Sequence, residues 1–561
     1  MPECSLLSGV NGMSLLKHGE DAKSPESSIR GGSGRPAISL SDLIVIGLLL
    51  LLFLATWKLG AAPTLRYGHD LFAALDAGWR AYSGQRPHVD FYCPYGAAVP
   101  LLLSLGMLLS HQTAASVGVA SAIAGLCCSL LAYRTAKRTL IPVFQVLVPI
   151  FVFLLAAAPS CLGEVLPSNA MYYTRWSFGL LAVILLECMM AERSGLADGV
   201  STGLALALLF FLKLNMFFVG LGILIPSLVL LSRRARLKGM TLGTASAAVV
   251  MSLYLKMHLA ALWHDYGIIL HAKAGATPLA SVLLLARSYW AVLVCLLLLA
   301  VPVRIAKQEW RGRVYFPLMA FAVFAADMLS LATNNQGPST PLSAFFALIC
   351  VSQLVAGGSW KTRAPSNQFL APILKFLLVL CGGLFVLSFA CMDAVVYYQA
   401  CVIKVKGIEP PLRFATASFS DYETFGNEPG PDGRPTDGVF LVAKVNDGLD
   451  LLSQNSTGIE SVAVLDFVNP FSFGLKRSPN RGGAVYLAYQ NDFNDEFKPD
   501  PAFVLGTADL VMIPRSPGLP TDEFEAVLRN YGPYLQLHFE PSAESAQWIM
   551  WRHRKGDLVL R

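Results

Sequence analysis

The chain of 561 residues is 54% hydrophobic and only 14% charged, and its mean hydropathy is +0.53. A soluble globular chain carries about 25% charged residues, so this composition excludes a soluble enzyme and predicts a polytopic α-helical membrane protein. The net charge of +6 is small for this length, and the cations gather in alternate loops, which argues against a nucleic-acid partner.

The chain divides by composition into three parts. Residues 1–40 are rich in glycine, serine, proline and charge and lack an apolar core, which predicts a disordered cytoplasmic tail. No cleavage site precedes the first apolar run, so we expect that run to remain as a membrane anchor. Residues 41–400 are expected to form the transmembrane domain, with external loops at 61–112 and 159–176.

Basic residues set the orientation of the expected spans. Arg134, Lys137 and Arg138 follow one apolar run and a second basic cluster fills residues 233–238, which the positive-inside bias places in the cytoplasm. Residues 94–110 are apolar but short, so we expect a helix that lies in or dips into the outer boundary. The chain would cross about eleven times, with its N-terminus inside and its C-terminus outside. The expected spans are residues 41–59, 113–133, 140–158, 177–191, 199–212, 216–231, 241–261, 281–303, 314–332, 341–356 and 369–392.

The third part, residues 401–561, has turns rich in glycine, proline, asparagine and aspartate that separate short strand-like runs. This alternation predicts a water-soluble, extracytoplasmic α/β domain with a small mixed sheet. Residues 465–483 are interpreted as a strand followed by structural turns. The expected strands are residues 461–467, 510–513, 534–539 and 547–551, and the expected helices are residues 447–454 and 521–529.

The eleven cysteines lie mostly in apolar runs and form no CxxC pair or metal-ligand spacing. They are interpreted as small core residues. Cys93, Cys161, Cys391 and Cys401 fall near the expected external ends of spans, and the sequence leaves open a disulfide among them.

The stretch that the chain is organised around is GHDLFAALDAGWRAYSGQRPHVDFYCPYG, residues 68–96, which carries Asp70, Asp76 and Asp90. The run after Asp70 has helical spacing, and Gly84 ends it. Carboxylates just beyond a span lie at the water–lipid boundary, where they stay ionised and can meet a substrate whose tail remains in the bilayer. Asp76 falls on a different helical face from Asp70 and is expected to be a solvated or helix-packing carboxylate, and Asp90 is expected to order the loop.

The order of parts in this stretch resembles the first external loop of GT-C glycosyltransferases, which use polyprenyl-phosphate sugars. The family has its catalytic base at an aspartate soon after the first span, and the resemblance assigns that role to Asp70. MYYTRW resembles a Tyr-Asn-Arg run of bacterial members, with Thr174 in place of asparagine, and FFLKLNMFF resembles the Leu-Thr-Lys-Gly turn of aminoarabinose-type transferases. The resemblance therefore implies that Lys213 and Arg175 bind the phosphate of the donor.

Further polar residues gather at the expected external ends of the spans. They are interpreted as lining of the donor or acceptor cavity, and they are Glu164, Tyr173, Asp90, His264 and Asp265. Interfacial tyrosine, arginine and lysine side chains are also common as simple membrane anchors, and this alternative stays open for Tyr173, Arg175 and Lys213. His264 and His271 do not match a metal-ligand spacing, so we expect no metal and no cofactor.

The resemblance implies a glycosyltransferase that moves a hexosyl or pentosyl group from a polyprenyl-phosphate sugar to an envelope glycan, lipid or protein on the outer face, with inversion. The expected location is the bacterial inner (plasma) membrane. Two alternatives are a secondary transporter and a non-enzymatic envelope assembly protein. Transporters favour internal repeats and ionisable groups near the bilayer midplane, whereas the polar residues of this sequence lie at the ends of its spans.

Overall fold

The computed structural model separates into two compact units, residues 1–40 and residues 41–561, and the second unit is described below. The expected disordered tail lies almost wholly outside the described residues. The structure describes residues 39–64, 67–191, 194–231, 233–272, 278–305, 310–334, 339–356, 370–407, 412–424, 438–455 and 461–554.

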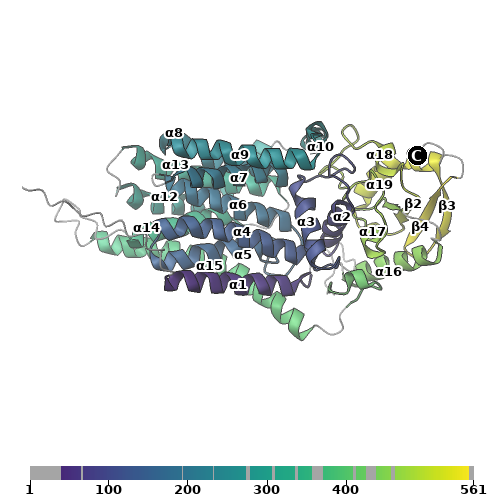
Figure 1. Cartoon of the computed structure of the whole chain (residues 1–561), viewed down its shortest axis with the longest axis horizontal. Helices are drawn as coiled ribbons and strands as arrows, with labels where there is room; N and C mark the ends of the chain where they lie inside the picture. Colours follow the sequence, from purple (N-terminus) through teal and green to yellow (C-terminus); the bar gives the residue numbers. More distant parts are fainter. Residues whose placement is uncertain are drawn as a thin grey trace, which may run out of the picture. The chain divides into compact units, whose positions relative to one another are not determined.

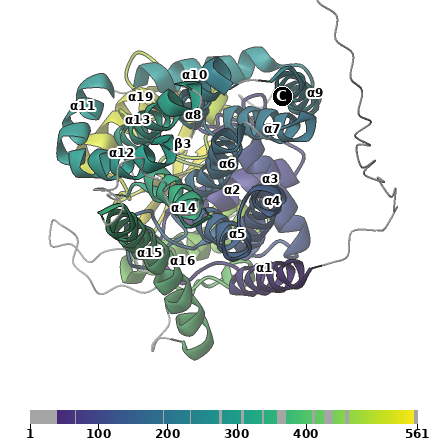
Figure 2. The ribbon, with the colours of Figure 1, turned by 90° about the vertical axis from the view of Figure 1, so that its left-hand side faces the viewer.

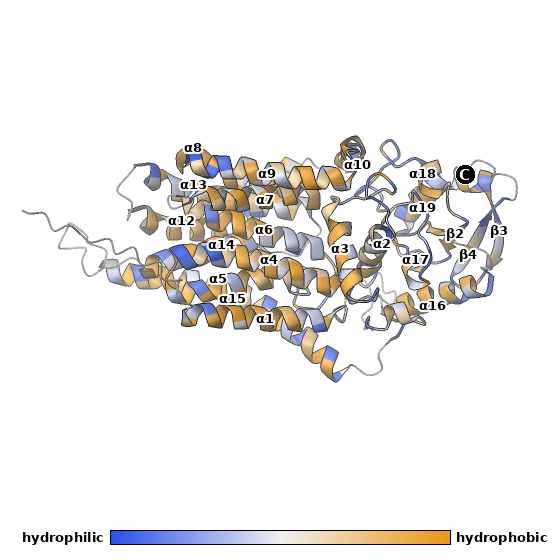
Figure 3. Cartoon of the chain, viewed as in Figure 1, coloured by the Kyte–Doolittle hydropathy of each residue, from blue (hydrophilic) through white to orange (hydrophobic). Residues whose placement is uncertain are grey.

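Apolar helices make up most of the chain before residue 407 (Figures 1 and 3). In the described part of the chain, five helices are long and apolar enough to cross a membrane: α1 (Leu40–Leu59), α4 (Ser116–Thr139), α8 (Leu214–Leu231), α13 (Trp310–Thr333) and α15 (Leu370–Lys406). Two bent pairs pass the same test together: α9 (Arg234–Tyr254) with α10 (Leu259–Ala272), bent by 97°, and α11 (Pro278–Ser288) with α12 (Trp290–Ile305), bent by 72°. The chain is therefore an integral membrane protein, and the count of eleven spans stays a prediction.

Shorter helices complete this part of the chain. Those of apolar composition are α3 (Ala98–Leu109), α5 (Pro142–Ala157), α7 (Leu196–Leu212) and α14 (Pro341–Ala356). At 1.5 Å per residue α3 is about 18 Å long, too short to cross the hydrocarbon core by itself. The remaining two are α2 (Asp70–Tyr82), which ends before Gly84 as the sequence predicts, and α6 (Tyr172–Met189).

Helix α6 is the central helix of the bundle. Almost all of its side chains are buried, because α4, α5, α7, α8 and α14 pack around it (Figure 2). Large apolar side chains instead remain exposed on the outer helices, for example Leu54 of α1, Val229 of α8 and Val249 of α9. This distribution is the one expected for helices that face lipid tails.

Helices α7 and α9 approach each other through two pairs of glycines spaced four apart. A methyl group built on Gly199 or Gly203 would lie 2.1 Å from the carbonyl oxygen of Arg236 or Met240. Gly239 of α9 is equally close to the Leu196 carbonyl of α7, at 2.1 Å. Small residues at this spacing let two membrane helices pack backbone to backbone. The glycines thus fix α7, whose last residue precedes Lys213.

Ion pairs and hydrogen bonds show which loops lie together at each end of the bundle. At one end, the basic cluster in the last turns of α4 meets the start of α1, where Lys137 Nζ lies 2.6 Å from Asp42 Oδ1. At the opposite end, Asn169 of the second predicted external loop donates to the Ala62 carbonyl at 2.7 Å, and Thr64 N donates to Glu423 O at 3.0 Å. The two predicted external loops and the C-terminal part therefore lie at the same end, away from the basic cluster.

The C-terminal part contains a mixed four-stranded sheet of order β1-β2-β4-β3, with β1 and β2 parallel and the other neighbours antiparallel. Its strands are β1 (Val462–Val464), β2 (Leu510–Pro514), β3 (Phe539–Glu544) and β4 (Trp548–His553). Its helices are the short 3-10 helix η3 (Ala417–Phe419), α16 (Gly438–Asn455), α17 (Phe471–Gly474), α18 (Pro501–Leu505) and α19 (Thr521–His538). The small mixed sheet predicted for this part is confirmed, and in Figure 3 the surrounding segments are more hydrophilic than the membrane helices.

One predicted strand, residues 534–539, is wrong. Helix α19 continues to His538, because Val527, Tyr531 and Leu535 are buried at a four-residue spacing that keeps one helical face against the sheet. The strand begins only at Phe539.

The four cysteines considered for a disulfide are free thiols. Cys93 and Cys161 are buried, Cys401 is half-buried and Cys391 is exposed. Burial raises the pKa of Cys93 well above its ordinary value, so this thiol stays protonated and unreactive.

Candidate active site

Asp70 is the first residue of α2, where the unpaired backbone N–H groups of a helix favour a negative charge. Its side chain is 28% exposed, and Oδ1 lies 3.3 Å from His69 Nε2. The turn before the helix is held from the C-terminal part, since the Tyr422 hydroxyl donates to the Gly68 carbonyl at 2.9 Å. Gly68 is packed against the same part of the chain, since a methyl group there would lie 2.8 Å from a Leu441 methyl and 3.0 Å from the Tyr422 hydroxyl. Two distant segments thus set the position of Asp70.

Lys213 lies at the break between α7 and α8 and points at the start of α6. Its Nζ donates to Thr174 Oγ1 at 3.1 Å and lies 4.7 Å from the centroid of the Tyr173 ring. The Asp70 carboxylate is within electrostatic range of the same Tyr173 side chain. The predicted phosphate-binding lysine therefore contacts a tyrosine that lies within electrostatic range of the predicted base.

The loop that contains the PYG sequence holds this arrangement from the side. Gly96 N donates to the Leu212 carbonyl at 2.9 Å, and a methyl group at Gly96 would lie 2.0 Å from Phe211 O. Tyr95 consequently packs against Tyr173, with ring centroids 4.8 Å apart and the ring planes tilted by 45°. The backbone of the opening loop is thereby fixed on the end of α7, one residue before Lys213.

Two aromatic residues of the C-terminal part complete the group. Phe467 packs edge-on against His69, with ring centroids 4.9 Å apart, and Tyr486 packs on Tyr95 at 5.5 Å. Phe467 and Tyr486 are themselves 5.6 Å apart, and both are half-buried. We call the resulting group the outer cluster, and its members are His69, Asp70, Tyr95, Tyr173, Lys213, Phe467 and Tyr486.

Glu164 lies beside the outer cluster. The Tyr67 hydroxyl donates to Glu164 Oε1 at 3.4 Å, and Tyr67 is near the His69 ring, with centroids 6.5 Å apart. This carboxylate is half-buried in the second predicted external loop. Its proposed role as lining of the cavity stays a prediction.

Asp90 stabilises the turn in which it lies. Its Oδ2 accepts hydrogen bonds from the backbone N of Arg86 at 2.8 Å and from Arg86 Nε at 3.0 Å. These bonds close the turn that leads to Cys93 and Tyr95. The contacts are those of a residue that orders the loop, which is the role that its position in the sequence predicts.

Asp265 of α10 faces inward, while the neighbouring His264 side chain is 70% exposed. Asp265 Oδ2 accepts from His88 Nδ1 at 2.9 Å and from the backbone N of Cys93 at 3.2 Å. Asp265 thus ties α10 to the opening loop. The proposed reaction uses neither His264 nor Asp265, since Asp265 bonds to the opening loop and His264 faces away from it.

Arg175 is buried on α6 and is engaged by protein groups on every side. Its Nη2 lies 2.7 Å from Oδ1 of Asp393 on α15, and its Nε donates to the Ser160 carbonyl at 2.6 Å. The remaining nitrogen donates to the carbonyls of Leu154 and Leu155 at 3.2 Å. These contacts neutralise the charge and occupy the donors, so we leave Arg175 out of the phosphate site that the sequence predicts for it.

Asp76 is fully buried, so its interpretation as a solvated carboxylate is wrong and the helix-packing alternative holds. It pairs with Arg80 one turn later, which is 1% exposed. Burial raises the pKa of Asp76, and the Arg80 guanidinium opposes this shift. The pair belongs to the support of α2, because Arg80 also binds the C-terminal part.

Sequence reasoning missed His69, Phe467, Tyr486 and Arg80. The spacing of Asp76 and Arg80 by four residues was an available signal for the last of these. Within the described part of the chain, no three His, Cys, Asp or Glu side chains gather in a group that could hold a metal. The expectation of a site without cofactor stays a prediction.

Comparisons with known proteins find likeness only in three dimensions. No protein-family model matches the chain, and no curated protein matches it in sequence. The chain is similar to the crystal structure of ArnT from Cupriavidus metallidurans bound to undecaprenyl phosphate, with 10% identity and a TM-score of 0.40, covering 92% of this chain and 98% of that chain. The apo structure of the same protein gives 12% identity and a TM-score of 0.37, covering 91% and 97% of the two chains.

A third similar structure is that of the arabinofuranosyltransferase AftD from Mycobacteria, with 10% identity and a TM-score of 0.39. The likeness covers 92% of this chain and 40% of the AftD chain.

Proposed function

We propose that the chain is a membrane glycosyltransferase of the GT-C kind, which moves a sugar from a polyprenyl-phosphate donor to an envelope glycan, lipid or protein. One observation carries the proposal. The carboxylate of Asp70 lies within electrostatic range of Tyr173, and the ammonium group of Lys213 lies 4.7 Å from the centroid of the same ring, at one end of a bundle of apolar helices. Glycosyl transfer from a lipid phosphate needs a base and a phosphate-binding cation at the edge of a bilayer.

The proposed reaction uses the two charges in opposite ways. Asp70 accepts the proton of the acceptor hydroxyl as its oxygen attacks the anomeric carbon of the donor sugar. The bond between that carbon and the phosphate oxygen breaks on the opposite face, so the configuration inverts. The polyprenyl phosphate leaves with both electrons of that bond, and Lys213 stabilises its negative charge. No general acid is needed, because phosphate leaves as an anion.

The half-buried position of Lys213 supports this role. A lysine is a point charge on a flexible stem, and it can bind a single phosphate oxygen without a fixed geometry. The Thr174 hydroxyl, 3.1 Å from Nζ, holds the ammonium group at the end of α7. The polyprenyl tail would then remain among lipid chains beside the helices while the phosphate stays at the boundary.

The proposal also includes the membrane in which the protein resides and the side on which each of its parts lies. The protein would reside in the inner (plasma) membrane of a bacterium, with the basic cluster at the end of α4 in the cytoplasm and the C-terminal domain outside. Glu164 would lie at the rim of the cavity. We propose no cofactor or metal.

The test is transfer by the purified full-length protein in lipid nanodiscs. The probe is a labelled sugar on undecaprenyl phosphate, the carrier lipid bound in the ArnT structure, with an envelope extract as acceptor. We expect label to move from the lipid to the extract, and we expect Asp70→Asn and Lys213→Ala to reduce the rate. Matched controls are Asp450→Asn and Lys256→Ala, because both side chains are exposed. Wild-type protein that transfers no sugar from any pentose or hexose donor of this class would refute the proposal.

A further inference from the structure

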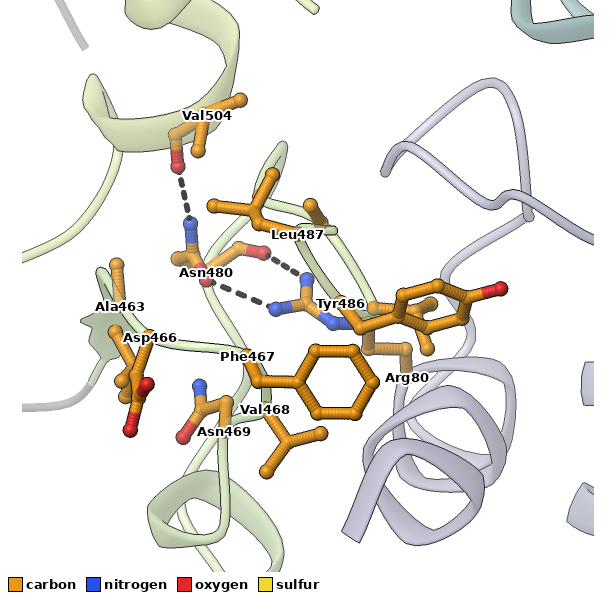
Figure 4. A pocket seen from close by; sticks show the side chains of 14 residues that line it. Arg80, Ala463, Asp466, Phe467, Val468, Asn469, Asn480, Tyr486, Leu487 and Val504 are labelled. Carbon is orange, nitrogen blue, oxygen red and sulfur yellow. Dashed lines mark hydrogen bonds between the residues drawn. The ribbon is translucent and has the colours of Figure 1, made fainter. Parts of the chain in front are cut away.

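The C-terminal part contributes two rings to the outer cluster, and the reaction described above does not use them. Phe467 lies next to β1, and Tyr486 lies in the segment after the turn at Gly482 and Gly483, where φ is +79° and +81°. An isolated bridge joins Val468 to Tyr486, so the two ring-bearing segments run side by side. Phe467 and Tyr486 line a small pocket together with Arg80 (Figure 4).

These segments are fixed to the helix that carries Asp70. Arg80 Nη1 donates to the carbonyls of Asn480 and Gly482 at 2.9 and 2.8 Å, and Trp79 Nε1 donates to the Arg477 carbonyl at 2.7 Å. The backbone of Tyr92 also donates to Gly483 O at 2.9 Å. The position of the two rings relative to Asp70 is therefore set by buried contacts and not by a flexible linker.

We infer that Phe467 and Tyr486 form a platform on which a sugar ring of the acceptor stacks. The inference rests on the proposed function, and it deepens that function by assigning the acceptor side of the site. The face of an aromatic ring is negative, which attracts the slightly positive C–H bonds of a sugar ring. Binding sites for such ligands are lined by aromatic side chains with a few polar groups that fix the orientation.

We assign the platform to the acceptor and not to the donor because Phe467 lies near the Asp70 carboxylate, whereas the Lys213 ammonium group contacts a different ring. Phe467 contacts His69, whose Nε2 is 3.3 Å from the Asp70 carboxylate. A sugar that stacks on Phe467 thus brings a hydroxyl group next to the base. Lys213, the proposed contact of the donor phosphate, packs instead on Tyr173 at the end of α7. The acceptor class is accordingly a carbohydrate, either a free glycan or the sugar part of a glycolipid.

The test measures binding separately from transfer. Full-length protein with Asp70→Asn is placed in nanodiscs and applied to an array of bacterial envelope oligosaccharides. Phe467→Leu and Tyr486→Leu should each weaken binding about threefold to tenfold, as expected for the loss of one aromatic contact, whereas Tyr486→Phe should keep it. The matched control is Tyr534→Leu, since Tyr534 packs on His538 of α19, outside the outer cluster.

Thermal unfolding of each variant checks that the fold is intact. Retained binding in a folded Phe467→Leu/Tyr486→Leu double variant would overturn the inference, and so would a parent protein that binds no oligosaccharide on the array. A protein that binds glycans through these rings but transfers no sugar in the nanodisc assay would refute the proposed function and leave the platform in place. A higher KM for the lipid donor in Phe467→Leu and Tyr486→Leu variants that keep Asp70, with unchanged glycan binding, would assign the rings to the donor and overturn the inference.

Discussion

Arg80 and Asp76 form an ion pair inside the protein, with Arg80 Nε 2.7 Å from Asp76 Oδ2 and with side chains that are 1% and 0% exposed. The pair also connects α2 to the C-terminal part. Arg80 reaches from α2 to carbonyl groups at Asn480 and Gly482, so the helix that begins at Asp70 and the turn that leads to Tyr486 share one buried cation.

Removal of either partner should destabilise the protein. Asp76→Asn or Arg80→Met leaves the other group buried without its counter-charge, which costs about 3–5 kcal/mol. The measurement is the free energy of unfolding of full-length protein in mixed micelles. The matched control is Arg515→Met, because the pair of Arg515 and Glu544 is exposed and contributes about 0–1 kcal/mol. Equal stability of Asp76→Asn and the control would contradict this role for the pair.

Arg175 should act on stability and not on donor binding. Arg175→Ala leaves Asp393 unpaired between α6 and α15, so we expect a loss of about 3–5 kcal/mol and a smaller yield of folded protein. Arg175→Lys should not restore stability, because an ammonium group cannot replace the planar fork that meets Asp393 and Ser160 together. Gel filtration and thermal unfolding measure the effect. A stable Arg175→Ala protein with a raised KM for the lipid donor would return Arg175 to the phosphate site.

The sequence predicts elements whose signals are local. Helix α2 and its stop at Gly84 follow from spacing and turn chemistry, and Lys213 stands out because it interrupts two apolar runs. The spacing by four residues of Gly199 with Gly203, a signal of close helix packing, was also present.

Contacts between segments far apart in the chain leave no such signal. Nothing in the periodicity around Phe467 or Tyr486 indicates that these rings pack near the start of α2. The partner of Arg175, Asp393, lies on a helix that reads as an ordinary apolar span. The sequence does not show that Asp76 is buried, either. Tertiary packing decides which face of α2 the C-terminal part covers.

The two ends of the bundle should lie on opposite sides of the membrane. We predict that Asp70, Glu164 and the C-terminal part are outside, while Arg134 and Arg234 are inside, because cations are retained in the cytoplasm. Reporter fusions after Arg138 and after the last residue measure the sidedness, and they should give opposite results. Labelling of single cysteines at Tyr67 and Lys137 is an independent check. The same side for both fusions would refute the orientation.

Lys213→Ala should weaken use of the lipid donor, and Lys213→Arg should keep part of it. A charge-assisted hydrogen bond contributes about 1.5–3 kcal/mol, which corresponds to about 10- to 150-fold in binding. The measurement is the KM for the undecaprenyl-phosphate sugar in nanodiscs, with Lys256→Ala as the control. Thr174→Val should give a smaller increase, since it removes only the hydroxyl that positions Nζ. Equal KM values for the wild type and Lys213→Ala would make Lys213 a simple membrane anchor.

Asp70→Asn should abolish transfer while the protein still folds and inserts. The amide keeps the shape of the carboxyl group but cannot accept the proton of the acceptor, and a general base contributes about 10²–10⁴-fold to the rate. Asp90→Asn should instead reduce the amount of folded protein, because Asp90 accepts the two hydrogen bonds from Arg86 that close the opening loop. Asp450→Asn, a change at an exposed position, serves as the control. The rate of transfer of labelled sugar, normalised to folded protein, separates the cases. An active Asp70→Asn protein beside a folded but inactive Asp90→Asn protein would move the base to Asp90.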